Sequence, residues 1–207
     1  MVAARVVVLA GPSGSGKSRL AQRLAADHGL PVLRLDDFYK SAGDPTLPVI
    51  DHGPNRGIVD WDHPDSWLPA EAVAALVELC RTGGVDVPVY DIAHDGRCGT
   101  QHLALDGAGL VVAEGLFAPD VVGPLREAGV LAAALCVRRP AAVTFALRLQ
   151  RDLREHRKPP PVLVRRGLAL MRDQRRVVAD AVAKGCEPVG LREAAARVAR
   201  LLAAAHR

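Results

Sequence analysis

The stretch Arg5–Ser18, RVVVLAGPSGSGKS, decides the fold that the sequence predicts. Its first six residues form an apolar, β-branched run that stops at Gly11, as a buried strand does. Residues 11–18 match the phosphate-loop pattern G-x-x-x-x-G-K-[ST]. Residues 17–28 then repeat apolar side chains at helical spacing, and Gly29 suits the end of that helix. A nucleotide-binding loop needs this order of strand, loop and helix, whereas a glycine-rich turn with a solvated lysine does not.

The residue types in this loop suit a triphosphate. Glycines let the backbone turn tightly and point its N–H groups inward, and the start of the following helix adds the positive end of its dipole. We expect the ammonium of Lys17 to reach the β- and γ-phosphates of ATP, and the hydroxyl of Ser18 to ligate Mg²⁺. The residues predicted to bind ATP are Gly11, Ser13, Gly14, Ser15, Gly16, Lys17 and Ser18.

Two carboxylates follow apolar runs that resemble strands. Asp36 follows the run 31–35, and Glu114 follows the run 110–113. Ligands of an open α/β sheet bind at the carboxyl ends of its strands, so both acids are expected beside the phosphate loop. Asp36 would accept a proton from an attacking hydroxyl or hold a water on the metal, and Glu114 would lie near the metal. The plainer alternatives are a capping or turn aspartate at 36 and a surface glutamate at 114.

Strand-like and helix-like segments alternate along the rest of the chain, which favours an α/β domain with a mostly parallel sheet. Residues 41–64 are rich in Gly, Pro, Asp and His and are predicted to form a long loop. No repeat or linker divides the sequence, so we expect one domain over residues 1–207. The other expected strands are 85–90, 101–105 and 131–137, and the other expected helices are 70–80, 141–155, 162–184 and 191–205.

The composition is that of a globular protein. Hydrophobic residues make up 49% of the chain and charged residues 24%, with a mean hydropathy of +0.11, which excludes disorder of the whole chain. The apolar run near the start is too short for a signal peptide and no run is long enough to cross a membrane, so a cytoplasmic protein is expected. The four cysteines lie far apart without a C-x-x-C pair, which argues against a disulfide framework or a zinc ribbon.

Positive charge is concentrated in one part of the chain. The formal net charge is +4, yet residues 138–176 alone contain twelve Lys or Arg and three Asp or Glu, which suggests a polyanionic partner. Within this segment, residues 148–158 (RLQRDLREHRK) carry charges at helical spacing. Cations that close over a transferring phosphate stabilise its charge, although a solvated helix with internal ion pairs is the alternative. Aromatic residues make up only 3% of the chain, which disfavours base stacking and therefore nucleic-acid binding.

The sequence resembles the uridine kinase family in six segments that occur in the family's order. They are GPSGSGKS (11–18), LDDFY (35–39), DWDHPDSW (60–67), VPVYD (87–91), VVAEG (111–115) and RLQRD (148–152). The family is grouped with phosphoribulokinase and pantothenate kinase among P-loop kinases. The resemblance implies a five-stranded, mostly parallel sheet flanked by helices, a small β-hairpin that contacts the substrate, and an Arg-rich lid at about 148–161. It also implies Mg·ATP-dependent phosphorylation of a primary hydroxyl, the 5′-OH of uridine or cytidine.

The resemblance assigns roles on the substrate side. Asp36 falls on the family's catalytic aspartate, which faces the sugar hydroxyl. Asp62 falls on the aspartate that hydrogen-bonds the ribose, and Tyr90 falls on the aromatic residue that contacts the pyrimidine. The family's histidine lies five residues after this tyrosine, where the present chain has Asp95. His94, one residue earlier, is therefore the candidate histidine for the substrate.

On the ATP side, Glu114 matches the family's acid near Mg²⁺. Arg148 and Arg151 match lid arginines that reach the substrate and the ATP phosphates, and Lys158 aligns with a further lid arginine. His156 stands where the family has another arginine. The catalytic residues predicted in this way are Lys17, Asp36, Arg148 and Arg151.

Two other classes of protein stay open. A regulatory nucleotide-binding protein also carries a phosphate loop, although a GTP switch needs an N-K-x-D stretch that this sequence lacks. The cationic segment suggests a nucleic-acid-binding protein, although no RNA- or DNA-binding motif accompanies it. Within kinases, a different small metabolite is the alternative acceptor. The expected partners are ATP and a small hydroxyl-bearing substrate, with no membrane and no nucleic acid, and the sequence leaves open whether the chain forms a homo-oligomer.

Overall fold

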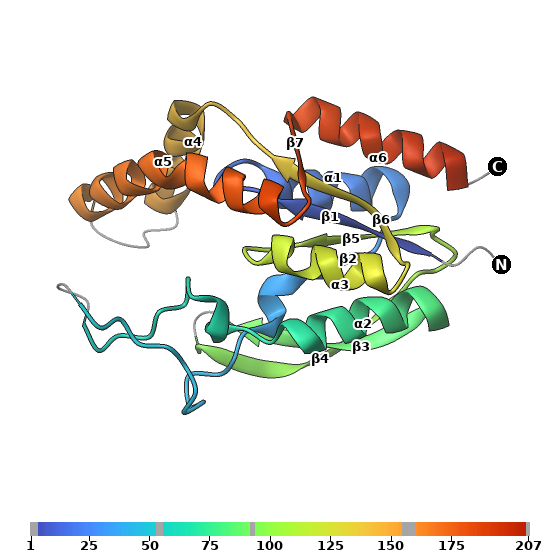
Figure 1. Cartoon of the computed structure of the whole chain (residues 1–207), viewed down its shortest axis with the longest axis horizontal. Helices are drawn as coiled ribbons and strands as arrows, with labels where there is room; N and C mark the ends of the chain where they lie inside the picture. Colours follow the sequence, from blue (N-terminus) through green and yellow to red (C-terminus); the bar gives the residue numbers. More distant parts are fainter. Residues whose placement is uncertain (1–3, 53–55, 92–93, 155–159, 206–207) are drawn as a thin grey trace.

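The computed structural model describes residues 4–52, 56–91, 94–154 and 160–205. A five-stranded sheet has helices on both faces, and a separate β-hairpin lies beside it (Figure 1). The strands of the sheet are β1 (Arg5–Ala10), β2 (Val32–Arg34), β5 (Leu110–Glu114), β6 (Leu131–Val137) and β7 (Glu187–Val189). Their order is β2-β5-β1-β6-β7, and every pairing is parallel. The predicted α/β fold with a five-stranded parallel sheet is thereby confirmed.

Both faces of the sheet are covered, which explains why β1, β5 and β6 are nearly continuous apolar runs rather than alternating ones. Helices α1 (Lys17–His28) and α6 (Leu191–Ala205) pack on the face that includes Val7 and Leu9. Helices α2 (Pro69–Thr82) and α3 (Val122–Glu127) pack on the face that includes Val6 and Val8. The three valines and the leucine at positions 6–9 of β1 have no exposed surface, so this strand forms the centre of both apolar layers.

Two long helices at the phosphate-loop end complete the upper part of the molecule in Figure 1. Helix α4 (Ala141–Arg154) packs against α5 (Pro160–Ala183). Helix α5 begins inside the proline triplet, where a residue with fixed φ and no N–H suits the first turn. A Cβ at Gly167 of α5 would lie 2.6 Å from the Phe145 ring of α4, so glycine permits this close approach.

The hairpin consists of β3 (Gly84–Asp91) and β4 (Gly96–Ala104), which pair antiparallel. It follows α2 directly and lies along that helix (Figure 1). Among the described residues, short 3-10 turns at Leu35–Phe38, Pro64–Ser66 and Ala118–Val121 connect the larger elements. Between the first two turns, the described residues form a long loop held by the isolated bridge Val49–Val59, in agreement with the prediction for 41–64.

Strand β7 and helix α3 are absent from the sequence-based expectations. Strand β7 is three residues long and contains Pro188, and α3 is six residues long and contains Pro124. Elements this short do not show the periodicity from which strands and helices are predicted. Among the described residues, no helix combines the length and the apolar character needed to cross a membrane.

Gly11 provides a test of the geometry at the end of β1. Its φ is +139°, and an added Cβ would lie 2.4 Å from the carbonyl oxygen of Val137 in β6. We expect Gly11→Ala to lower the free energy of unfolding by about 2 kcal/mol or more, because both the backbone conformation and the contact oppose a side chain. Urea denaturation measures the change.

The matched control is Gly83→Ala. Gly83 ends α2 with φ +90°, and an added Cβ there meets no atom within 4 Å. It should therefore cost about 1 kcal/mol, from backbone conformation alone. If Gly11→Ala were no more costly than Gly83→Ala, the close approach of the phosphate loop to β6 would be wrong.

Candidate nucleotide and acceptor site

Three neighbouring strands end at the same level. Leu9 of β1 and Arg34 of β2 both lie opposite Glu114 of β5 in the sheet register. The phosphate loop leaves β1 there, and the 3-10 turn Leu35–Phe38 leaves β2 beside it. Helices α4 and α5 lie over this end of the sheet (Figure 1). The residues predicted to bind ATP and to activate the acceptor therefore converge from separate parts of the sequence.

The phosphate loop has the shape that its glycines allow. Gly14 and Gly16 take φ values of +86° and +97°, which only glycine adopts without strain. Ser15 is fully buried, and its N–H donates to the carbonyl of Pro12 at 3.0 Å. Within the described part of the chain, the Ser15 hydroxyl is the buried side-chain group that lacks a hydrogen-bond partner. An orphaned hydroxyl inside a loop of this kind fits a phosphate-bearing ligand.

Ser18 and Glu114 form the pair predicted to hold the metal. The Ser18 hydroxyl donates to Glu114 Oε2 at 2.9 Å, and only 8% of the Glu114 surface is exposed. Burial raises the pKa of the Glu114 carboxyl, while the nearby Lys17 ammonium and the Ser18 hydrogen bond lower it in part. Mg²⁺ in phosphate-transferring sites typically takes one or two protein oxygens and completes its shell with phosphate and water. A hydroxyl and a carboxylate in contact beside the phosphate loop fit that ion.

Asp36 lies in the 3-10 turn after β2 with its carboxylate turned toward the end of β5. Asp36 Oδ1 accepts the backbone N–H of Leu116 at 2.9 Å. A Cβ at Gly115 would lie 2.8 Å from the same oxygen, so glycine at 115 leaves room for the carboxylate. The negative charge of Asp36 also contributes to the raised pKa of Glu114, which places the two acids near each other.

Asp37 connects this turn to the hairpin. Its side chain is almost fully buried, and Asp37 Oδ1 accepts the backbone N–H of Tyr90 at 3.3 Å. The Arg34 guanidinium lies 3.7 Å from the same oxygen. Burial raises the pKa of Asp37 although Arg34 opposes the shift. This carboxylate fixes where Tyr90 stands relative to Asp36.

Three rings gather next to Asp36. The ring centroid of Tyr39 lies 5.9 Å from that of Trp61 and 5.8 Å from that of Tyr90, and the Trp61 and Tyr90 centroids are 6.4 Å apart. We call these three rings the aromatic cluster. Burial raises the pKa of the Tyr39 phenol, and the Asp36 and Asp62 carboxylates raise it further. Asp62, predicted to contact the acceptor, therefore lies close to the cluster.

The two tryptophans differ in their surroundings. Trp67 is 2% exposed and stacks on Phe117 with centroids 5.3 Å apart, so it is a packing residue. Trp61 is half-buried and belongs to the aromatic cluster. The sequence analysis did not single out Tyr39 or Trp61 for the site. Tyr39 lies three residues after Asp36 in DDFY, and Trp61 directly precedes Asp62 in DWD. This closeness in sequence to predicted site residues was the signal that could have identified them.

His94 and Asp95 lie at the turn of the hairpin. The His94 ring contacts Asp91 Oδ2 at 2.6 Å, and its side chain is 78% exposed. Burial raises the pKa of Tyr90, and the Asp95 carboxylate adds to that shift. Asp95, which occupies the position of the family's histidine, is thus a neighbour of Tyr90, whereas the contact that the structure gives for His94 is with Asp91.

The predicted lid falls on α4 and α5. Arg148 and Arg151 lie on α4, and the structure describes their backbone and not their side chains. Lys158 lies outside the described residues. Their predicted contacts with substrate and phosphates stay predictions.

Among the described residues, no group of three or more His, Cys, Asp or Glu side chains could hold a metal ion.

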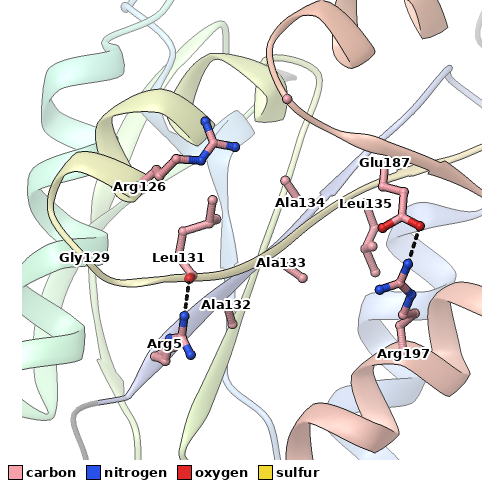
Figure 2. Close-up of a pocket in the computed structure, with 11 residues that line it drawn as sticks. Arg5, Arg126, Gly129, Leu131, Ala132, Ala133, Ala134, Leu135, Glu187 and Arg197 are labelled. Atoms are coloured by element: carbon pink, nitrogen blue, oxygen red, sulfur yellow. Dashed lines mark hydrogen bonds and ion pairs between the residues drawn. The ribbon is translucent and has the colours of Figure 1, made fainter.

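A separate hollow of about 500 Å³ lies at the opposite end of the sheet. Figure 2 shows it over the first residues of β6, with the pair Glu187–Arg197 on one side and Arg126 on the other. The first residue of β1, Arg5, donates to the Leu131 carbonyl at 2.7 Å there. Arg5, Leu131 and Glu187 are the first residues of their strands, so this hollow is distinct from the candidate site.

The chain is similar to known proteins in sequence and in fold. Residues 6–83 match the family model described as an AAA domain. The chain is 32% identical over 117 residues to the uridine kinase of Schizosaccharomyces pombe, covering 55% of this chain and 25% of that protein. It is 29% identical over 173 residues to the uridine kinase of Chloroflexus aurantiacus strain J-10-fl, covering 81% of this chain and 77% of that protein.

A solved structure of a candidate fructose transport system kinase from a Silicibacter species superposes with a TM-score of 0.60 at 21% identity, covering 86% of each chain. The chain is therefore similar in sequence to uridine kinases and shares the fold of this solved kinase structure. At this identity the solved structure supports the fold alone. The chain also matches only a quarter of the length of the S. pombe uridine kinase. The P-loop kinase fold is therefore a finding, and the reaction is a proposal.

Glu114 gives a prediction about stability. Its raised pKa means that the folded protein binds a proton above pH 4.5 more readily than the unfolded chain, so burial of Glu114 lowers the stability of the nucleotide-free protein as pH rises above that value. We expect Glu114→Gln to raise the unfolding temperature at pH 7.5 by about 2–4 °C, because the buried charge is removed. The gain should shrink toward pH 4.

Differential scanning calorimetry without nucleotide measures this effect. The matched control is Glu127→Gln, which removes an exposed carboxylate at the end of α3. Its unfolding temperature should stay within about 1 °C of the parent. An unfolding temperature for Glu114→Gln at or below that of the parent at pH 7.5 would contradict the account of this site.

Proposed function

We propose that the chain is an ATP-dependent kinase that transfers the γ-phosphate of ATP to a primary hydroxyl of a small substrate, the 5′-OH of uridine or cytidine. The observation that carries the proposal is the convergence of the Ser18–Glu114 pair and the Asp36 carboxylate on the phosphate loop. A phosphate loop alone fits many nucleotide-binding proteins. A kinase also needs a group that activates the acceptor hydroxyl, and a second carboxylate, oriented by a backbone N–H and close to the first, can do this.

The ATP half of the site follows from the loop. Its amides and the Lys17 ammonium bind the phosphates, and Ser18 and Glu114 hold Mg²⁺ directly or through water. Held by these residues, Mg²⁺ would supply positive charge that offsets the negative charge of the phosphates. Arg148 and Arg151 lie on the helix at this end of the sheet, where their cations would stabilise the charge that spreads over the transferring group.

The acceptor half follows from Asp36. The Leu116 N–H holds Asp36 Oδ1, so the carboxylate is oriented and its other oxygen can take the hydroxyl proton. As that proton moves to Asp36, the acceptor oxygen bonds to the γ-phosphorus and the bond to the bridging β-phosphate oxygen breaks. The products are a phosphate ester and ADP. Aligned groups in a restricted site supply much of the rate enhancement in such transfers.

The aromatic cluster favours a nucleoside as the acceptor. Three rings within 6.4 Å of one another supply apolar faces for a flat base, and Asp62 lies beside them for a sugar hydroxyl. The sequence relatives are uridine kinases, which supports a pyrimidine. Asp95 beside Tyr90 favours a second candidate, a different small metabolite rich in hydrogen-bond donors, because a carboxylate there accepts hydrogen bonds.

An ADP-release assay with separate acceptors tests the reaction. Uridine and cytidine should each stimulate ADP release, whereas pantothenate, fructose and other nucleosides should stimulate it less. If a sugar or pantothenate stimulated ADP release and the nucleosides did not, the acceptor would be that other metabolite and not a nucleoside. ATP turnover that no acceptor changes would indicate a regulatory nucleotide-binding protein instead.

Asp36→Asn tests the proposed base. The amide keeps the size of the side chain and cannot take a proton, so kcat should fall by about 10²–10⁴-fold. Binding of Mg·ATP should change little, because Asp36 faces the acceptor. The matched control is Asp65→Asn, an exposed aspartate of the 60–67 segment, which should leave kcat unchanged. A kcat for Asp36→Asn within about threefold of the parent would remove Asp36 from the mechanism.

Lys17→Ala tests the ATP half separately. Loss of the ammonium should weaken ATP binding by about tenfold or more and abolish turnover, because a charge-assisted contact with the phosphates disappears. Isothermal titration with Mg·ATP measures the affinity. Unchanged affinity in Lys17→Ala would mean that ATP binds elsewhere.

A further inference from the structure

A cation from outside the sequence motifs described above contacts the phosphate loop. The turn between β6 and α4 carries Arg139, whose Nε donates to the backbone carbonyl of Ser15 at 2.9 Å. Arg139 is half-buried, and no carboxylate of the described chain lies within ion-pair distance of it. Its hydrogen bond therefore goes to the loop, 124 positions away in the sequence.

This contact sets the direction of one amide. In a trans peptide unit, the carbonyl and the following N–H point to opposite sides. Because the Ser15 carbonyl is turned toward Arg139, the Gly16 N–H is directed away from it and is available to a phosphate oxygen. Phosphate loops bind their ligand through such amides, so a fixed Ser15 carbonyl preorganises the loop.

The guanidinium also lies against the start of α1. A Cβ at Gly16 would lie 3.4 Å from Arg139 Nη2 and 3.5 Å from Leu191 Cδ1. Arg139 and the first residue of α6 thus enclose the loop from the outside. The positive charge of Arg139 therefore lies against the phosphate loop, where it adds to the field that attracts a triphosphate.

Helix α5 holds Arg139 in turn. Gln174 Nε2 donates to the backbone carbonyl of Arg139 at 2.8 Å, and Gln174 is only 9% exposed. A buried amide on an otherwise basic helix needs such a partner. A chain of two hydrogen bonds therefore runs from α5 through the turn to the phosphate loop. The cationic segment 138–176 contains both residues, and this contact gives part of it a structural connection to the site.

We propose that Arg139 is a positioning residue that holds the phosphate loop in its ligand-binding shape, and that Gln174 holds Arg139. The proposal rests on the ATP-binding function proposed above. If so, the affinity for ATP depends on the Arg139 side chain, which contacts the loop, and on helix α5, which holds Arg139 in place. Gln174 connects this positioning to α5, which packs against the helix that carries Arg148 and Arg151.

The test compares Arg139→Ala with Arg138→Ala. Arg138 is the exposed neighbour, so its variant removes the same charge one residue away. By isothermal titration, Arg139→Ala should bind Mg·ATP about tenfold or more weakly, the loss expected for a charge-assisted hydrogen bond. Arg138→Ala should stay within about twofold of the parent. In the kinase assay, the KM for ATP should rise in Arg139→Ala and the KM for the acceptor should not.

Two further variants separate positioning from general stability. Arg139→Lys keeps a donor for the Ser15 carbonyl and should recover most of the lost affinity. Gln174→Met keeps the size of the side chain without a donor and should weaken binding by a smaller factor. In the double variant Arg139→Ala/Gln174→Met, affinity should be no weaker than in Arg139→Ala, because both changes act through one chain of contacts.

The outcomes distinguish this inference from the proposed function. If the parent binds Mg·ATP, Lys17→Ala loses it and Arg139→Ala keeps it, the ATP site stands and the role of Arg139 is overturned. Equal losses in Arg139→Ala and Arg138→Ala, or no recovery in Arg139→Lys, overturn the positioning role as well. If the parent does not bind Mg·ATP at all, the proposed function fails and the inference fails with it.

Discussion

The parallel register between β1, β5 and β2 is the constraint on which the candidate site depends. It places Leu9, Glu114 and Arg34 at one level, so the phosphate loop and the turn that carries Asp36 must leave the sheet side by side. The space between them is small. Glycine at 11 admits the Val137 carbonyl, and glycine at 115 admits the Asp36 carboxylate. The chemistry of the site is therefore a consequence of how closely these strand ends pack.

This arrangement conflicts in part with stability. Glu114 is buried as a carboxylate, and the Ser15 hydroxyl is buried without a partner. Each lowers the stability of the nucleotide-free protein. The fully buried valines of β1 and β5, packed on both faces of the sheet, offset that cost. A ligand that supplies a cation and phosphate oxygens would satisfy both groups, so the residues that weaken the empty site are those that favour binding.

The sheet can be predicted from the sequence, and so can the positions of the residues proposed to bind ATP, because both depend on local patterns. The run Arg5–Ala10, the loop that follows it and the acid at the end of 110–113 can be recognised one segment at a time. The acceptor half is harder, because it depends on contacts between distant segments. The hydrogen bond from Tyr90 to Asp37 joins positions 53 residues apart, and the Trp61 ring packs on Tyr39 and Tyr90 from another distant segment.

Arg139 illustrates the same limit. Its neighbour in space, Ser15, is distant in the sequence, and nothing about an arginine before Pro140 marks it as a partner of the phosphate loop. Strand β7 was missed for a related reason, since three residues with a proline show no period, although β7 completes the sheet beside the strand that leads to Arg139. Local patterns indicate which chemistry a chain can carry, and the packing decides which side chains take part.

The most direct test of the central claim follows the phosphate itself. The protein is incubated with Mg²⁺, uridine and ATP labelled with ³²P at the γ-position, and the products are separated by chromatography. The account predicts that the label appears in uridine 5′-monophosphate and that ADP forms in equal amount. Label that remains in ATP or appears only as inorganic phosphate, with uridine, cytidine and every other hydroxyl-bearing acceptor tried, would contradict it.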